Sequence, residues 1–170
     1  MSEIYLGNPN LKKANTPIQF SAEQIEEFLK CKNNPVYFAQ KYVKIVSLDE
    51  GLVPFQPYKF QEKLIKRFHK NRFNICKMPR QTGKSTTVVS YLLHYAVFND
   101  SVNIGILANK AATARELLGR LQTAYENLPK WMQQGVLVWN RGSLELENGS
   151  KILAASTSAS AVRGMSFNIL

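Results

Sequence analysis

The residues Gln81-Thr82-Gly83-Lys84-Ser85 have the types and order that can hold a phosphate group. Glycine lets a backbone approach an anion closely, lysine supplies a compact cation, and a serine hydroxyl can bind a magnesium ion that bridges phosphates. Backbone N–H groups converge where a strand turns into a helix, and the helix dipole adds positive potential there. We therefore predict a site for ATP and Mg²⁺. The predicted loop residues are Gln81, Thr82, Gly83, Lys84, Ser85 and Thr86, with Ser85 binding the metal through the nucleotide.

The elements around this loop are predicted to alternate between strand and helix. Residues 73–78 are expected to form a strand, with Cys76 packed inside, and residues 86–98 a buried helix. A second strand is expected over residues 102–107 and a second helix over residues 111–127. Such alternation is typical of an α/β fold, in which helices flank a parallel sheet.

Shorter elements are expected on both sides of this unit. Residues up to about Pro17 are predicted to form an arm, followed by helices over residues 21–30 and 34–42, an extended stretch over residues 43–53, and a helix from Pro57. The turn at Asn148-Gly149 predicts a β-hairpin. We divide the chain into an N-terminal arm and helical region, residues 1–52, and an ATPase domain, residues 53–170.

Composition favours a compact domain with a polyanionic partner. The sequence is 45% hydrophobic and carries a formal net charge of +10. Residues 1–90 contain 15 basic and 7 acidic side chains, so most of the excess lies there. Such an excess favours nucleic acid or an anionic membrane surface, although a basic enzyme without such a partner shows it too. The two cysteines form no CxxC pair, and no apolar run is long enough to span a bilayer.

The phosphate loop departs from the general pattern GxxxxGK[ST], because Met78 occupies the first glycine position. Helicases and small-molecule kinases with such loops usually keep that glycine. Met78 at this position therefore counts against both of these protein classes. A third possibility is a nucleotide-binding module without catalytic activity.

Several segments together resemble the large terminase subunit of tailed phages, closest to the myovirus type. The segment Met78-Pro79-Arg80-Gln81-Thr82-Gly83-Lys84-Ser85 is similar to that family's deviant Walker A motif, which lacks the first glycine. Residues 55–61 resemble its adenine-binding glutamine motif, residues 105–110 its next strand–helix unit, residues 139–150 its hairpin, and residues 158–164 its loop ending in Arg-Gly. The resemblance implies an incomplete RecA/ASCE-like P-loop NTPase fold that carries a β-hairpin.

The resemblance also implies roles for particular residues. Gln61, with Gln56 as second candidate, would read the adenine edge, and Phe60 or Tyr58 would supply a ring against the base. Arg80 would reach the γ-phosphate within the same chain, or else form a structural salt bridge. Arg163 would act across a subunit interface, or else contact a backbone carbonyl or a DNA phosphate.

The family implies a motor that drives double-stranded DNA into a procapsid in the cytoplasm of the infected bacterial host. Its partners would be the portal, the small terminase subunit, further copies in a ring, and the missing C-terminal part of the same enzyme, without a membrane. The family's catalytic Asp-Glu pair follows an apolar strand, and neither Asp49-Glu50 nor Glu145 and Glu147 fits that place. Residues 167–170 resemble the start of that Walker B strand. We expect this chain to bind ATP without effective turnover, and to expose apolar surface.

Overall fold

A computed structural model describes residues 3–47, 49–157 and 164–170 of the chain. Its largest sheet has the strand order β5-β8-β7-β6. The strands are β5 (Asn103–Ala108), β6 (Val136–Trp139), β7 (Ser143–Leu146) and β8 (Lys151–Ser156). β5 and β8 are parallel, whereas β7 is antiparallel to both of its neighbours. The predicted α/β class is therefore confirmed, but the sheet is mixed and not wholly parallel.

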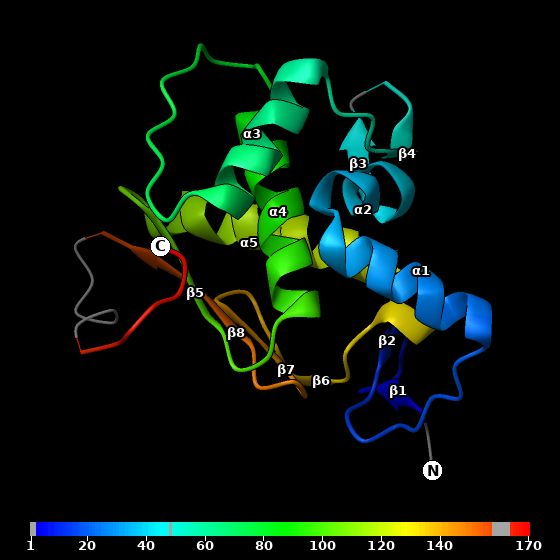
Figure 1. The fold of residues 1–170 in the computed structure, drawn as a ribbon. Coiled ribbons are helices and arrows are strands. Elements are labelled where there is room, and N and C mark those ends of the chain that lie inside the picture. The colour runs from blue at the N-terminus through cyan, green and yellow to red at the C-terminus, as the bar shows by residue number, and fades with distance from the viewer. Residues whose placement is uncertain (1–2, 48, 158–163) are drawn as a thin grey trace.

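Helices cover this sheet in successive layers. Helix α5 (Ala111–Glu126) packs on β5 and β8, α4 (Lys84–Phe98) packs on α5, and α3 (Lys59–Lys70) packs on α4 (Figure 1). The core between sheet and helices is apolar, and Leu118, Leu121 and Ile152 are almost fully buried in it. After α5, a short 3-10 helix, η1 (Lys130–Met132), leads into β6.

The N-terminal helices begin where their capping residues predict. The Ser21 side chain accepts from the backbone of Gln24 and the Gln24 side chain accepts from that of Ser21, which caps α1 (Ala22–Asn33). Asn34 caps α2 (Pro35–Tyr42) in a similar way, with proline at the first helical position. The extended stretch that follows is a hairpin of β3 (Lys44–Ser47) and β4 (Gly51–Pro54). The predicted domain boundary at residues 52 and 53 falls inside β4 and stays a prediction.

The predicted arm is instead a folded hairpin that packs on the body of the molecule. Strands β1 (Ile4–Tyr5) and β2 (Asn8–Lys12) pair with each other, and Leu11 is only 1% exposed. Lys13 continues the contact through a parallel bridge to Val136 on β6. Gly7 lies in the turn of this hairpin and Pro9 lies in β2. These two residues do not leave the segment unstructured, because contacts with distant residues hold the hairpin in place.

The strand predicted at residues 73–78 is absent. This stretch lies in an irregular segment, residues 71–83, that joins α3 to α4 along the outside of the molecule (Figure 1). Phe73 is 83% and Ile75 101% exposed, and Cys76 is exposed, not packed as expected. A strand needs a hydrogen-bonding neighbour, and no strand of the described residues lies beside this segment.

The hairpin turn predicted at Asn148-Gly149 is confirmed, and a second turn joins β6 to β7. Asn140 accepts at its side-chain oxygen from the backbone of Gly142 and Ser143, which closes the turn between β6 and β7. Gly149 has a φ of 80° in the turn between β7 and β8. Beyond the undescribed residues, Ile169 forms a parallel bridge to Ile104 on β5. Residues 167–170, which resemble the start of a further strand, therefore lie beside β5 at the edge of the sheet.

Candidate phosphate-binding site

The predicted phosphate loop lies at the N-terminus of α4. Gly83 precedes the helix with a φ of 71°, in the left-handed region, and Lys84 is the first helical residue. Gln81 also has a positive φ of 61°, so the loop is tightly wound before the helix begins. This is the helix start that the sequence predicted, although the helix begins two residues earlier than expected. The strand expected before the loop is absent.

Lys84 folds back over its own loop. Its Nζ donates to the carbonyl oxygen of Met78 at 3.2 Å and also to that of Pro79. The Thr82 hydroxyl donates to the same Pro79 carbonyl, at 3.1 Å. The ammonium group thus sits among carbonyl oxygens inside the loop. An incoming phosphate would offer the same donor a more strongly charged acceptor.

Gln61 connects α3 to the loop. Its side chain is almost fully buried, its Oε1 accepts from the backbone N–H of Tyr58 at 2.8 Å, and its Nε2 donates to the carbonyl of Gly83 at 3.4 Å. A Cβ at position 83 would lie 2.5 Å from that Nε2. Both polar atoms of the Gln61 amide are therefore used within the protein, so the amide positions the loop.

A cavity of about 480 Å³ adjoins the loop. The hairpin of β3 and β4, the start of α3 and the loop together form its walls. Its lining residues are Ile45, Pro54, Phe55, Gln56, Tyr58, Phe60, Gln61, Gln81, Thr82, Gly83 and Thr86. The structure thus brings both predicted glutamines together with four predicted loop residues. Lys84 and Ser85 lie next to them along the chain but do not line the cavity.

Two aromatic rings and one exposed amide line this cavity. Tyr58 and Phe60 are exposed and stacked on each other, with ring centroids 5.8 Å apart and planes 11° apart. Gln56 is exposed, whereas the Gln61 amide is already engaged. The walls from β3 and β4, including Ile45 and Pro54, were not predicted from the sequence. Neither residue type signals a site, and only the fold places them here.

The structure describes one of the two predicted arginines, Arg80. Arg80 is exposed in the loop, and no acidic partner for it occurs within residues 3–47, 49–157 and 164–170. The alternative of a structural salt bridge at Arg80 therefore finds no support there. Arg163 lies outside the described residues.

The glutamates rejected as catalytic acids have structural contacts. Glu145 pairs with Lys151 across the hairpin, at 3.3 Å, and Glu147 pairs with Lys12 at 2.8 Å. Glu147 also accepts from the backbone N–H groups of Asn15 and Gly135. Burial acts to raise the pKa of Glu147, but these hydrogen bonds outweigh it and hold the pKa below its ordinary value. Within the part of the chain that the structure describes, no three or more His, Cys, Asp or Glu side chains gather as a metal site.

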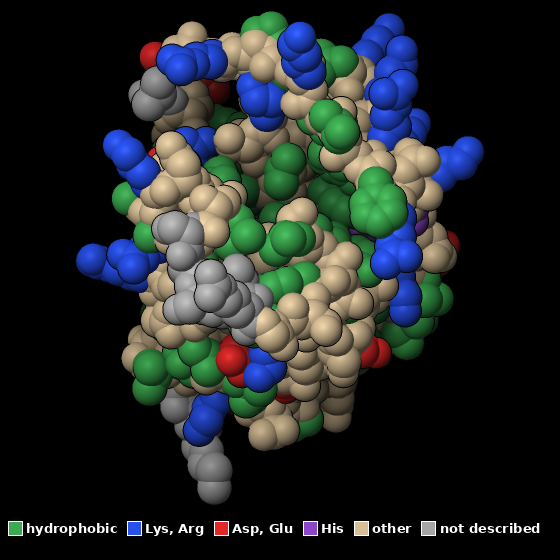
Figure 2. Space-filling model, turned by 90° about the vertical axis from the view of Figure 1, so that its left-hand side faces the viewer, with side chains coloured by type: hydrophobic (Ala, Val, Ile, Leu, Met, Phe, Trp, Pro, Cys, Tyr) green, Lys and Arg blue, Asp and Glu red, His purple; other side chains and the backbone are tan. Residues whose placement is uncertain are grey.

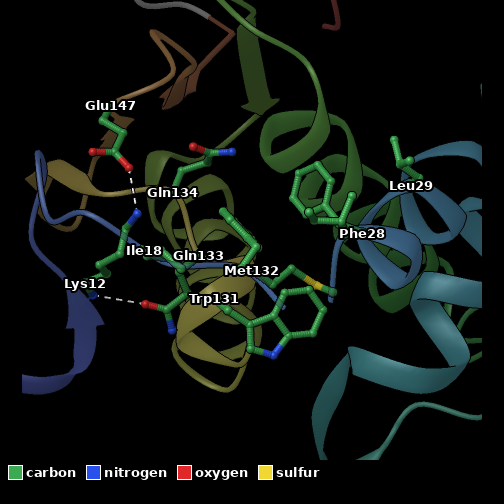
Figure 3. A pocket seen from close by; sticks show the side chains of 11 residues that line it. Lys12, Ile18, Phe28, Leu29, Trp131, Met132, Gln133, Gln134 and Glu147 are labelled. Atoms are coloured by element: carbon green, nitrogen blue, oxygen red, sulfur yellow. Dashed lines mark hydrogen bonds and ion pairs between the residues drawn. The ribbon is translucent and has the colours of Figure 1, made fainter. Parts of the chain in front are cut away.

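A second cavity, of about 410 Å³, lies between the N-terminal hairpin, α1 and η1. Figure 3 shows the apolar side chains of Phe28, Leu29 and Trp131 on one side, and the Lys12–Glu147 ion pair on the other. Gln133 also lines it, but its amide bonds to the backbone of Lys12, Asn10 and Leu128. The polar groups named here thus serve to hold the N-terminal hairpin.

Comparisons with known proteins bear on the family and the fold of this chain. A family model described as "Terminase large subunit, T4likevirus-type, N-terminal" matches residues 75–170, more than half of the chain. The fold is similar to that of the HK97 bacteriophage large terminase, with a TM-score of 0.66 and 18% sequence identity. That match covers 80% of this chain and 29% of the HK97 chain, so this chain spans less than a third of its length. At this identity the structural likeness supports the fold alone. No helix in the described ranges is both long and apolar enough to cross a membrane.

Proposed function

This chain belongs to the T4-like family of terminase large subunits, and on that premise we propose that it is the nucleotide-binding portion of a phage DNA-packaging motor. Membership makes it a component of a packaging terminase. The further proposal is that the loop at residues 78–85 holds ATP and Mg²⁺, and that the complete motor uses ATP hydrolysis to move double-stranded DNA into a procapsid.

The observation that carries this proposal is the meeting of three features at one place. A left-handed glycine, Gly83, turns the chain into α4, Lys84 begins that helix, and a cavity of about 480 Å³ opens beside them. The first N–H groups of a helix have no partner within the helix and carry positive potential. An anion of the size of a triphosphate is the ligand that this arrangement suits best.

Each residue then has a role in holding the nucleotide. Lys84 exchanges its loop carbonyls for the terminal phosphates, and the Ser85 hydroxyl, half-buried in the first turn of α4, binds the magnesium ion that bridges them. Tyr58 and Phe60 offer ring faces to the base. Gln56 is the better placed glutamine to read the adenine edge, because the amide of Gln61 is occupied.

Catalysis is proposed for the motor and not for this chain by itself. A carboxylate that orients water or magnesium is needed for hydrolysis, and Glu145 and Glu147 are held in ion pairs and do not line the cavity beside the loop. Arg80 is exposed and free to reach a γ-phosphate. We propose that this chain binds ATP without effective turnover, and that Arg163 of one subunit serves the site of another in a ring.

The remaining partners follow from the family and are proposals too. They are double-stranded DNA, the portal, the small terminase subunit and the C-terminal part of the same enzyme, in the cytoplasm of the infected bacterium. The net charge of +10 fits DNA as a partner.

The decisive experiment is nucleotide binding by Lys84→Ala. With a fluorescent ATP analogue and Mg²⁺, we expect the Kd to rise about 10- to 100-fold, because a hydrogen bond to a charged group contributes about 1.5–3 kcal/mol. Lys32→Ala, which removes an exposed lysine from the end of α1, is the matched control and should leave the Kd unchanged.

Two outcomes would count against the proposal. Equal binding by the Lys84 and Lys32 variants would show that the loop does not hold phosphate. Steady ATP turnover by this chain, lost on Lys84→Ala, would refute the proposed lack of catalysis.

A further inference from the structure

Helix α3 presents a row of basic side chains to solvent. Lysines recur at the helical spacing i, i+4, i+7 and i+11, with an arginine beside them. This α3 basic stripe consists of Lys59, Lys63, Lys66, Arg67 and Lys70, all exposed. At a rise of about 1.5 Å per residue, the helix that carries it is about 18 Å long.

The packing of α3 fixes the direction of the stripe. Gln61 and Ile65 are buried, and Phe68 is half-buried on the same face, which packs towards α2 and α4. At 3.6 residues per turn this buried face lies nearly opposite the four lysines. The stripe therefore cannot turn inward without unpacking the helix.

The positive charge of the stripe is not neutralised by neighbouring acids. Glu62 is the one acidic residue of α3, and its carboxylate accepts from Gln40 at 2.9 Å. Among the described residues, no side chain of the stripe forms an ion pair. An ordinary solvated helix face commonly mixes charges of both signs. The basic side chains of this face have one sign and no ion-pair partner among the residues that the structure describes.

The positive surface continues from α3 towards the phosphate loop. Arg72, Lys77 and Arg80 are exposed along the segment that joins α3 to α4. In Figure 2, Lys and Arg side chains border a hollow in which apolar side chains are visible. Because α3 also supplies Gln61 to the loop, the stripe and the nucleotide site lie on opposite faces of one helix.

We propose that the α3 basic stripe is a surface that binds the phosphate backbone of double-stranded DNA. A duplex carries one negative charge per about 1.7 Å of its axis, so a basic surface about 18 Å long can face several backbone phosphates at once. Lysine ammonium groups are point charges that contact phosphates without reading bases. Such contacts suit a protein that must move along any sequence. The choice of DNA over other polyanions rests on the proposed function.

The test compares two triple variants with equal loss of charge. Lys63→Gln, Lys66→Gln and Lys70→Gln together remove three of the five basic side chains of the stripe. The control combines Lys32→Gln, Arg115→Gln and Arg141→Gln, which are exposed on α1, on α5 and in the turn after β6. The probe is a short fluorescein-labelled DNA duplex of arbitrary sequence, and anisotropy is measured between roughly 50 and 200 mM salt.

We expect the stripe variant to lower the slope of log Kobs against log salt by about 2.7, at about 0.9 per lost phosphate contact. The control should keep a slope close to that of the unchanged chain. Two duplexes of unrelated sequence should bind the unchanged chain equally. Thermal unfolding should be the same for all three proteins, because every substituted side chain is exposed.

Other results would overturn the inference. Equal loss of DNA affinity in both triples would mean that net charge alone attracts DNA. Stripe-dependent binding to anionic phospholipid vesicles without stripe-dependent binding to DNA would assign the surface to a membrane. The proposed nucleotide site is judged separately, by the fluorescent ATP analogue. DNA binding that depends on the stripe would stand even if the nucleotide does not bind, and the reverse also holds.

Discussion

Gly83 shows how a single residue can determine the shape of the phosphate loop. Its φ of 71° is a conformation that other residues adopt at a cost, and its missing Cβ leaves room for the amide of Gln61. The requirement for glycine at position 83 is therefore linked to the presence of glutamine at position 61. The sequence identified both residues and assigned Gln61 to the base, which stays a prediction. The contact of Gln61 with the Gly83 carbonyl, 22 positions away, was not predicted, because it depends on how α3 packs.

We expect Gly83→Ala to weaken both the fold and nucleotide binding. The left-handed conformation costs a residue with a Cβ about 1–2 kcal/mol, and the Cβ would also meet Gln61 Nε2. Urea unfolding should show a loss of at least about 1 kcal/mol, and the Kd for the ATP analogue should rise because the loop must shift.

Gly119→Ala is the matched control for this prediction. Gly119 lies inside α5, and nothing is within 4 Å of the position of its Cβ. Alanine there should stabilise the protein by about 0.5–1 kcal/mol and leave binding unchanged. Unchanged binding by Gly83→Ala would show that the loop tolerates a side chain and that the link to Gln61 is unimportant.

At the scale of elements, the helix caps were predicted from local sequence signals, whereas the long-range contacts were not predicted. Ser21 and Asn34 cap their helices through neighbours three residues away, so a sequence pattern reveals them. The N-terminal hairpin is held by Glu147, whose carboxylate accepts from Asn15 132 positions earlier. No sequence pattern within residues 1–17 predicts that contact. The hairpin therefore resembled a loose arm in the sequence.

Glu147 should make the docking of this hairpin depend on pH. Its pKa is lowered in the folded protein, so its contribution is present above the pKa of the unfolded chain, about 4.3, and is lost as the pH falls through the lower folded value. At neutral pH we expect Glu147→Gln to lower the free energy of unfolding by about 1–3 kcal/mol, because Lys12 loses its partner while almost fully buried.

Urea unfolding from pH 7 down to pH 3 checks this prediction. The difference between Glu147→Gln and the unchanged chain should shrink below about pH 4. His94, buried on α4, has its pKa lowered to about 4 by desolvation, so it destabilises both proteins alike on acidification and cancels from the difference. Glu145→Gln is the control, because its ion pair with Lys151 is partly exposed and should contribute less than about 1 kcal/mol. A difference that persists at pH 3 would show that the carboxylate charge is not what holds the hairpin.

At the scale of the whole molecule, the predicted alternation of strand and helix fails in one segment. The alternation of strands and helices holds from α4 through α5, where β5 finds β8 as a neighbour. Residues 73–78 have the apolar residues of a strand, yet Phe73 and Ile75 stay exposed to solvent. Strand propensity is realised only where a partner supplies hydrogen bonds and a buried face. A sequence pattern shows the propensity and not the presence of the partner.

The exposed apolar side chains of this segment should make the chain associate with itself. Large exposed apolar patches drive association in water, and an unpaired extended segment offers free backbone groups as well. We expect Phe73→Ser with Ile75→Ser to reduce concentration-dependent light scattering and the binding of the dye ANS. The midpoint of urea unfolding should not change, because neither side chain is buried. Leu6→Ser, at a side chain that is 87% exposed in the N-terminal hairpin, is the control and should leave the scattering close to that of the unchanged chain. A lower unfolding midpoint in the double variant would show that Phe73 and Ile75 are packed in solution, and the segment would then have a partner within the folded chain.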